Sequence, residues 1–329
     1  MLTLRGQAPL ICVDDLFKVA MNLFVFFMKK QLLTVIITSM FFGSSVLGAK
    51  NKVLKIGTRP ESVTKGFDGK YYVTVMNSPD TEGDGVIKVL DGDKSSVFAK
   101  GMDEPKGIAF TGKYLVTADQ TKILKIDRKG KVSVLVDKKN FMRNVSFLND
   151  VASSSDRKSI FVTDMGAVSM MFDPDKDRTL WPLDSKQAKE LKAEGCVYQI
   201  TLDGKITDAV APGNSSLPGP NGVGRAGKNE LLLCDFFTGN ILRKTAKGQL
   251  NVIAKGLRGA DAVNTGGKGV IYVSSWTQGK VWKLTENGKK SEVILEDLLS
   301  AADFFVDMKA NKLIVPDMLA GTLIFVDIQ

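Results

Sequence analysis

The apolar and polar positions of this 329-residue chain repeat with a period of about 40 to 45 residues. In the stretch from Pro218 to Leu257, four short apolar runs are separated by turn residues such as Lys247 and Gly248, which predicts four short strands. The second strand is the clearest marker, and six copies of it occupy 69–77, 112–120, 157–165, 228–236, 268–276 and 310–318. Four strands per repeat are typical of a propeller blade. The sequence therefore predicts an all-β fold, a six-bladed β-propeller.

The two ends of the repeat array complement each other. The sixth copy stops at Gln329 without a fourth strand, and the segment 52–57 (KVLKIG) reads as a lone strand ahead of the first copy. We expect this N-terminal strand to complete the last blade and close the ring, because closure removes the open strand edges of a linear array.

Residues 1–48 do not follow the repeat. Met28 begins a basic segment that is followed by an apolar run and small residues before Ala49, the pattern of a secretory signal peptide. We expect the true start at Met28, with 1–27 as an upstream extension, and cleavage after Gly48. The alternative is an uncleaved membrane anchor. The expected product is a periplasmic or secreted propeller spanning 49–329, with no membrane segment after cleavage.

Composition excludes several kinds of chemistry. The chain has no histidine, so it cannot form a Ser-His-Asp or Cys-His site or a His-ligated zinc site. The net charge is +9, but the lysines are scattered through turns, which argues against a nucleic-acid partner. Cys196 and Cys234 lie within predicted strands; we expect two buried thiols, and a disulfide is the alternative.

One polar residue precedes the first strand in each repeat. First strands of propeller blades line the central channel, so these side chains should converge on the axis. The six positions are Glu61, Lys106, Asn149, Asn221, Asp261 and Asp303.

Four of these residues carry oxygen donors that suit calcium. Glu61, Asn149, Asn221 and Asp261 are predicted metal ligands, because calcium takes six to eight oxygen ligands and leaves positions for water and substrate. Taken singly, each residue could be an ordinary turn or strand cap. Their shared position in the repeat favours the metal site.

The motifs PESV at Glu61, LND at Asn149, PNG at Asn221 and GAD at Asp261 resemble those of the SMP-30/gluconolactonase/LRE-like propellers, a family that includes regucalcin. The resemblance covers the chain from about Gly57 to its end. It implies that Glu61, Asn221 and Asp261 bind a divalent cation, typically calcium. It further implies that Asn149 is a ligand or substrate contact and that Asp261 is the catalytic base. Where lactonases of this family often carry a sugar-contacting Arg, this chain has Phe147.

An insertion lengthens the third repeat between its second and third strands, near 166–195. Long loops usually have a role, so we expect a substrate cover, with Trp181 as a substrate contact and a short helix from Ser185 to Glu194 ended by Gly195. Lys106 and Asp303 should face the substrate or pair with each other. Aspartates that end second strands, at 119, 164, 235 and 317, are expected to cap turns.

The sequence thus predicts a calcium-dependent hydrolase whose partner is a small-molecule lactone or ester. In this prediction Asp261 accepts a proton from an activated water. A non-catalytic NHL-like propeller that binds a ligand or protein, and a phosphotriesterase-like hydrolase, are the alternatives. The oligomeric state stays open.

Overall fold

The structure is a computed structural model, and it describes residues 51–79 and 81–328. The described residues belong to one compact unit that begins at Asn51. The predicted signal peptide and start site therefore lie outside the described residues. Within the described part, no helix is long and apolar enough to span a membrane.

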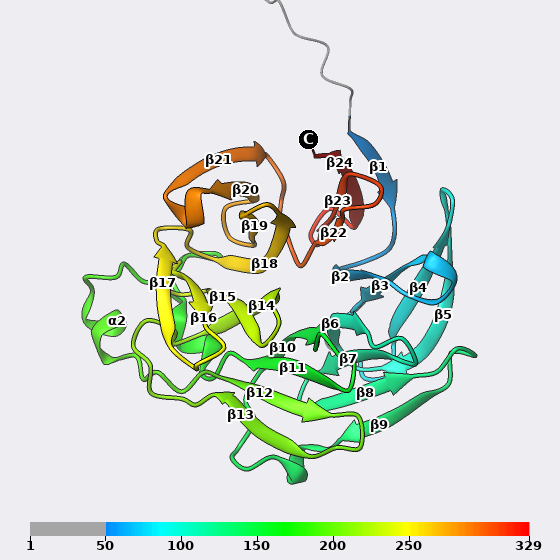
Figure 1. Ribbon diagram of the computed structural model, residues 1–329, viewed down its shortest axis with the longest axis horizontal. Coiled ribbons are helices and arrows are strands. Elements are labelled where there is room, and N and C mark those ends of the chain that lie inside the picture. Colours follow the sequence, from blue (N-terminus) through cyan, green and yellow to red (C-terminus); the bar gives the residue numbers. More distant parts are fainter. Residues whose placement is uncertain (1–50, 80, 329) are drawn as a thin grey trace, which may run out of the picture. The chain divides into compact units, whose positions relative to one another are not determined.

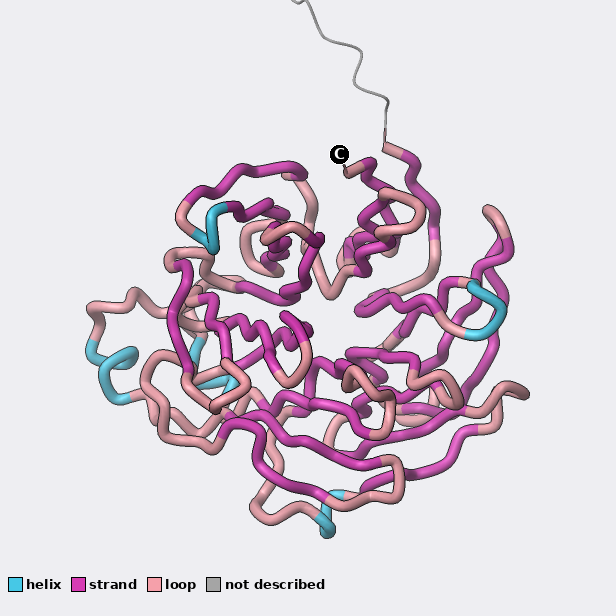
Figure 2. Tube along the Cα trace, viewed as in Figure 1, coloured by secondary structure: helices cyan, strands magenta, loops and turns pink. Residues whose placement is uncertain are grey.

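Six four-stranded antiparallel sheets are arranged around a central axis (Figures 1 and 2). Blade one contains β2 (Pro60–Lys65), β3 (Tyr71–Val75), β4 (Gly85–Asp91) and β5 (Lys94–Met102). Blade two contains β6 (Pro105–Phe110), β7 (Leu115–Asp119), β8 (Lys122–Ile126) and β9 (Val132–Val136). Blade three contains β10 (Leu148–Ser153), β11 (Ser159–Asp164), β12 (Cys196–Thr201) and β13 (Ile206–Val210).

The remaining blades follow the same order, with the first strand innermost (Figure 1). Blade four contains β14 (Pro220–Gly227), β15 (Glu230–Asp235), β16 (Ile241–Lys244) and β17 (Leu250–Ala254). Blade five contains β18 (Ala260–Gly267), β19 (Val270–Ser275), β20 (Lys280–Thr285) and β21 (Lys290–Leu295). Blade six contains β22 (Phe305–Asp307), β23 (Lys312–Asp317), β24 (Thr322–Asp327) and, as its outer strand, β1 (Lys52–Lys55).

The predicted fold class and ring closure are confirmed. β1 pairs antiparallel with β24, from Lys52 opposite Phe325 to Lys55 opposite Thr322. The core consists chiefly of six apolar clusters, one between each pair of neighbouring blades, including a cluster between blades six and one. Each cluster buries faces that a single sheet would expose, so the blades stabilise one another around the ring.

Helical structure in the described chain is confined to short connections. The 3-10 turns are η1 (Phe67–Gly69), η2 (Lys138–Asn140), η3 (Val168–Met171) and η4 (Glu286–Gly288). The predicted helix of the blade-three insertion is present but shorter than expected. It is α2 (Lys186–Glu190), capped by the Ser185 hydroxyl, and it ends at Leu191, where the backbone becomes extended, rather than at Gly195.

Candidate functional site

The innermost strands carry a β-bulge at the same place in five blades. In blade one, Pro60 is opposite Val75 and Val63 is opposite Val73, so Glu61 and Ser62 together face one residue of β3. A bulge bends its strand and re-aims the side chains within it. The first bulge residues are Glu61, Lys106, Asn149, Asn221 and Asp261.

Side chains on the second strands satisfy the backbone of these bulges. The N–H groups that follow Glu61, Asn149, Asn221 and Asp261 donate to Thr74 Oγ1, Thr163 Oγ1, Cys234 Sγ and Ser274 Oγ. A bulge leaves backbone groups without ladder partners, and burial would make that costly. Cys234 therefore has a polar role that we did not predict, and both Cys196 and Cys234 are free thiols.

In four blades, a buried aspartate at the end of the second strand fixes the chain that enters the innermost strand. Asp164 accepts the N–H groups of Ser146 and Phe147, and Asp317 accepts those of Leu299 and Ser300. Asp119 and Asp235 act in the same way in blades two and four. These aspartates are the turn caps that the sequence predicts.

The four predicted metal ligands lie together on the axis, and each is at most 6% exposed. Each also has one buried oxygen without a hydrogen-bond partner in the described structure: Glu61 Oε2, Asn149 Oδ1, Asn221 Oδ1 and Asp261 Oδ1. The amide nitrogens are used elsewhere, since Asn221 Nδ2 donates to Asp261 Oδ2 at 3.2 Å and Asn149 Nδ2 lies 3.1 Å from Met165 Sδ. Buried polar atoms normally have partners, so four unsatisfied oxygens in one place need an explanation.

Electrostatics at this cluster disfavours bare carboxylates. Burial, reinforced by the charge of Asp150, raises the pKa of Asp261 to about 8. Burial and the neighbouring Asp261 and Asp150 raise the pKa of Glu61 well above its usual range. Like charges and low polarity both oppose ionisation.

A divalent cation would give the four oxygens a partner and would favour the ionised form of the two carboxyls. Carboxylate and amide oxygens are the donors that calcium prefers, and the four unsatisfied oxygens supply four of them. Within residues 51–79 and 81–328, no three His, Cys, Asp or Glu side chains are grouped to hold an ion. The candidate centre therefore depends on its two amides as well as its two carboxylates.

Lys106 lies beside the cluster and does not pair with Asp303. Its Nζ is 3.3 Å from Glu104 Oε2 and 4.7 Å from the centroid of the Phe147 ring. Glu104 also pairs with Arg59, whose Nη2 lies 3.0 Å from Glu104 Oε1. These three charged side chains therefore form one group at one side of the site, and the charges of Lys106 and Arg59 partly offset the rise in the pKa of Glu61 that burial causes.

A cavity of about 320 Å³ opens above the four oxygens. Much of its wall consists of the side chains of residues that come directly after the second strands. We did not identify this position as part of the site from the sequence. In five of the six repeats this residue is Met or aromatic, which is a signal that the sequence does contain. These residues are Met76, Met165, Phe236, Trp276 and Met318.

The predicted register of blade six is off by one residue. Ala301 pairs with Asp317, as Ala260 pairs with Ser275 in blade five, so Ala302 is the equivalent of Asp261. The prediction aligns Asp303 with Asp261, because the dipeptide Ala-Asp occurs at 260–261 and again at 302–303. A shift of one residue turns a side chain to the opposite side of a strand.

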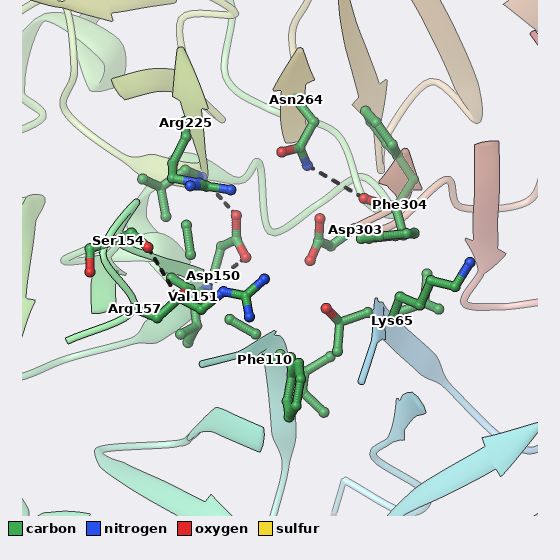
Figure 3. Close-up of a pocket in the computed structure, with 18 residues that line it drawn as sticks. Lys65, Phe110, Asp150, Val151, Ser154, Arg157, Arg225, Asn264, Asp303 and Phe304 are labelled. Carbon is green, nitrogen blue, oxygen red and sulfur yellow. Dashed lines mark hydrogen bonds between the residues drawn. The ribbon is translucent and has the colours of Figure 1, made fainter. Parts of the chain in front are cut away.

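Asp303 instead faces a second cavity of about 300 Å³, at the other end of the inner strands (Figure 3). Its carboxylate accepts the Ser62 hydroxyl and lies near Asp150 (Figure 3). Burial and the charge of Asp150 raise the pKa of Asp303 well above its usual range. Asp303 is therefore not a substrate contact of the first cavity.

The insertion reaches the first cavity through Val168 and Phe172 but not through Trp181. Trp181 packs in the cluster beneath the insertion, and its carbonyl accepts a hydrogen bond from Arg258 at 2.7 Å. Arg178 donates to the Leu299 carbonyl at 2.9 Å and lies over the Trp276 ring. The insertion thus bridges from blade three toward blades five and six, and Trp181 anchors it.

Neither a family model nor a curated protein sequence matches this chain. Solved structures do match it. A gluconolactonase from Xanthomonas campestris is 15% identical over 85% of this chain and 91% of its own, with a TM-score of 0.61. A putative gluconolactonase is 13% identical over 85% and 92%, with a TM-score of 0.60.

A third similar structure is virginiamycin B lyase from Staphylococcus aureus, which is 16% identical over 85% of this chain and 99% of its own, with a TM-score of 0.58. At these identities the likeness shows a shared propeller fold. The presence of gluconolactonases among the neighbours is consistent with the family resemblance of the motifs.

Proposed function

We propose that this protein is a calcium-dependent hydrolase of lactones or related esters. The observation that carries the proposal is the group of four buried oxygens at the floor of the first cavity that have no partner among the described residues. Two similar structures are gluconolactonases, one of them putative, which supports the same class of activity. The predicted signal peptide supports a site of action outside the cytoplasm, with a mature N-terminus near Ala49 that mass spectrometry would detect.

In this proposal Glu61, Asn149, Asn221 and Asp261 hold the cation. A bound calcium ion would supply Lewis-acid polarisation of a substrate carbonyl. Asp261 accepts a proton from the water that attacks the carbonyl carbon and returns it to the departing alcohol oxygen as the acyl C–O bond breaks; a nearby positive charge would keep its carboxyl ionised beforehand. The amide nitrogen of Asn221 positions Asp261 through their 3.2 Å hydrogen bond. The apolar wall excludes bulk water and so strengthens these interactions.

Two substitutions separate binding from chemistry. Asp261→Asn retains an oxygen donor but removes the base, so it should keep much of the calcium-dependent rise in melting temperature and lose hydrolysis by about a hundredfold or more. Glu61→Ala should lose both. Asp203→Asn, in an exposed turn, is the matched control and should change neither.

The assay compares lactones, aryl esters and phosphotriesters, each with calcium and with chelator. Hydrolysis that survives chelator, or an Asp261→Asn protein as active as wild type, would contradict the mechanism. Turnover of phosphotriesters alone would favour the phosphotriesterase alternative. A calcium-dependent shift without turnover of any substrate would favour a propeller that only binds its ligand.

A further inference from the structure

Each polar side chain of the first cavity is either one of the four proposed metal ligands or a member of the ion-paired group. Seven polar or charged side chains line it in the described structure, and four of them are the oxygen donors on the axis. The other three, Arg59, Glu104 and Lys106, pair with one another. A substrate rich in hydroxyls would therefore find few free partners, and unpaired polar groups in a closed site weaken binding.

The opposite side of the cavity offers aromatic surface. The rings of Phe172, Phe236 and Trp276 contact one another, with centroids 5.7, 6.3 and 6.4 Å apart. They come from the insertion, blade four and blade five, so the insertion completes this aromatic triad. Met76, Met165 and Met318 extend the apolar surface around the axis, and thioethers adapt readily to apolar ligands.

We propose, resting on the hydrolase function above, that the substrate is a small lactone or ester with an aromatic or branched apolar group. That group lies against the triad of Phe172, Phe236 and Trp276, while the reacting carbonyl lies over the four oxygen donors. Phe147, which packs on Lys106, adds apolar surface on the side of the charged group. The volume of about 320 Å³ fits a small molecule.

The first measurement compares two lactones with the wild-type protein. Dihydrocoumarin carries an aromatic ring, and D-glucono-δ-lactone carries hydroxyls. We expect kcat/KM to be at least about tenfold higher for dihydrocoumarin. A site that leaves the hydroxyls of a substrate without hydrogen-bond partners discriminates against that substrate. A preference for the sugar lactone would overturn the inference.

The second measurement uses the insertion. Phe172→Ala should raise KM for dihydrocoumarin roughly tenfold and leave kcat and the sugar lactone little changed, because it removes apolar contact without touching the oxygen donors. Met170→Ala is the matched control, since Met170 is exposed on the same insertion and does not line the cavity. An equal effect of both variants, or no effect of Phe172→Ala, would overturn the inference.

A binding measurement separates this inference from the hydrolase proposal. Calorimetry would compare 3,4-dihydro-2-quinolinone, the lactam of dihydrocoumarin, with D-glucono-δ-lactam in the presence of calcium. If neither lactone is hydrolysed but the aromatic lactam binds at least about tenfold more tightly, the hydrolase proposal fails and the aromatic preference stands. Tighter binding of the sugar lactam, or binding of neither, would overturn the preference.

Discussion

At the scale of single residues, the surroundings of Asp261 support the proposed cation. Its Oδ2 accepts a hydrogen bond from Asn221 while its Oδ1 has no partner in the described structure. Burial raises its pKa to about 8, so the free protein holds a proton there at neutral pH. A buried carboxyl with one unpartnered oxygen and a raised pKa supports the proposed cation, which would bind that oxygen and favour the ionised form.

The raised pKa values predict a pH dependence. The folded pKa of Asp261 lies above the unfolded value of about 3.9. Its contribution to the stability of the calcium-free protein is therefore full below about pH 4 and is lost as the pH rises through about 8. Calcium competes with that proton, so the calcium-induced rise in melting temperature should grow from pH 6 to pH 9. Thermal unfolding with calcium and with chelator measures it.

Asp261→Asn is the control for this titration. This substitution should reduce the pH dependence of the calcium-induced rise in melting temperature. Part of the rise and of its pH dependence should remain, since Glu61 also has a raised pKa. A calcium-induced shift of the same size at pH 6 and pH 9 would contradict competition between proton and cation.

Single residues also mark the limit of sequence reasoning at the site. Glu61, Asn149, Asn221 and Asp261 could be found because each occupies the same place in its repeat, beside the first strand. Asp303 could not be assigned correctly, because the pairing of Ala301 with Asp317 determines the register of blade six.

At the scale of elements, the site depends on how a second strand holds neighbouring first strands. Thr163 on β11 accepts the N–H of Asp150 at 2.9 Å and donates to the carbonyl of Asn221 at 2.6 Å. Its hydroxyl thus joins the bulge of blade three to that of blade four. Gly222 permits the same close approach on the next side, because a Cβ there would lie 2.5 Å from the Asp261 carbonyl oxygen.

Thr163→Val keeps the shape of this side chain and removes its hydroxyl. Two buried backbone groups then lose partners, each at a cost of about 1–3 kcal/mol. We expect a lower free energy of unfolding and a smaller calcium-induced shift, measured by chemical denaturation with and without calcium. Thr163→Ser should retain both bonds and most of the stability.

Thr207 provides a matched control in the same blade. It lies on β13, is exposed, and its hydroxyl makes one long contact of 3.4 Å with the Gln199 carbonyl. Thr207→Val should change stability by less than about 0.5 kcal/mol. A Thr163→Val protein that unfolds like the Thr207→Val protein would show that the link between the bulges contributes little.

At the scale of the whole molecule, the repeat made the fold predictable and the cavity wall unpredictable. Strand positions follow from local patterns of apolar residues, which repeat in all six copies. Met165, Phe236 and Trp276 also repeat, but they read as strand ends. Only the closed ring brings them over the axis beside Phe172, which comes from an insertion that has no counterpart in the other blades.

Ring closure gives the last prediction. β1 pairs with β24, Ile56 is buried among side chains of blades six and one, and Lys88 Nζ donates to the Ile56 carbonyl at 2.6 Å. Removing residues up to Gly57 would leave the edge of β24 open and expose that cluster. Several kcal/mol would be lost, and a melting temperature lower by about 10 °C or more is expected at about 2–4 °C per kcal/mol.

A chain that begins at Asn51 is the control, because it is shortened and still keeps β1. It should melt at the temperature of the mature protein that begins near Ala49, whereas the chain that begins at Thr58 should melt lower and associate through its open edge. Calorimetry and light scattering distinguish the two. If the two chains melt at the same temperature, the inter-blade clusters alone hold the ring and β1 is dispensable. If the shorter chain melts lower, blade six depends on residues from the other end of the chain.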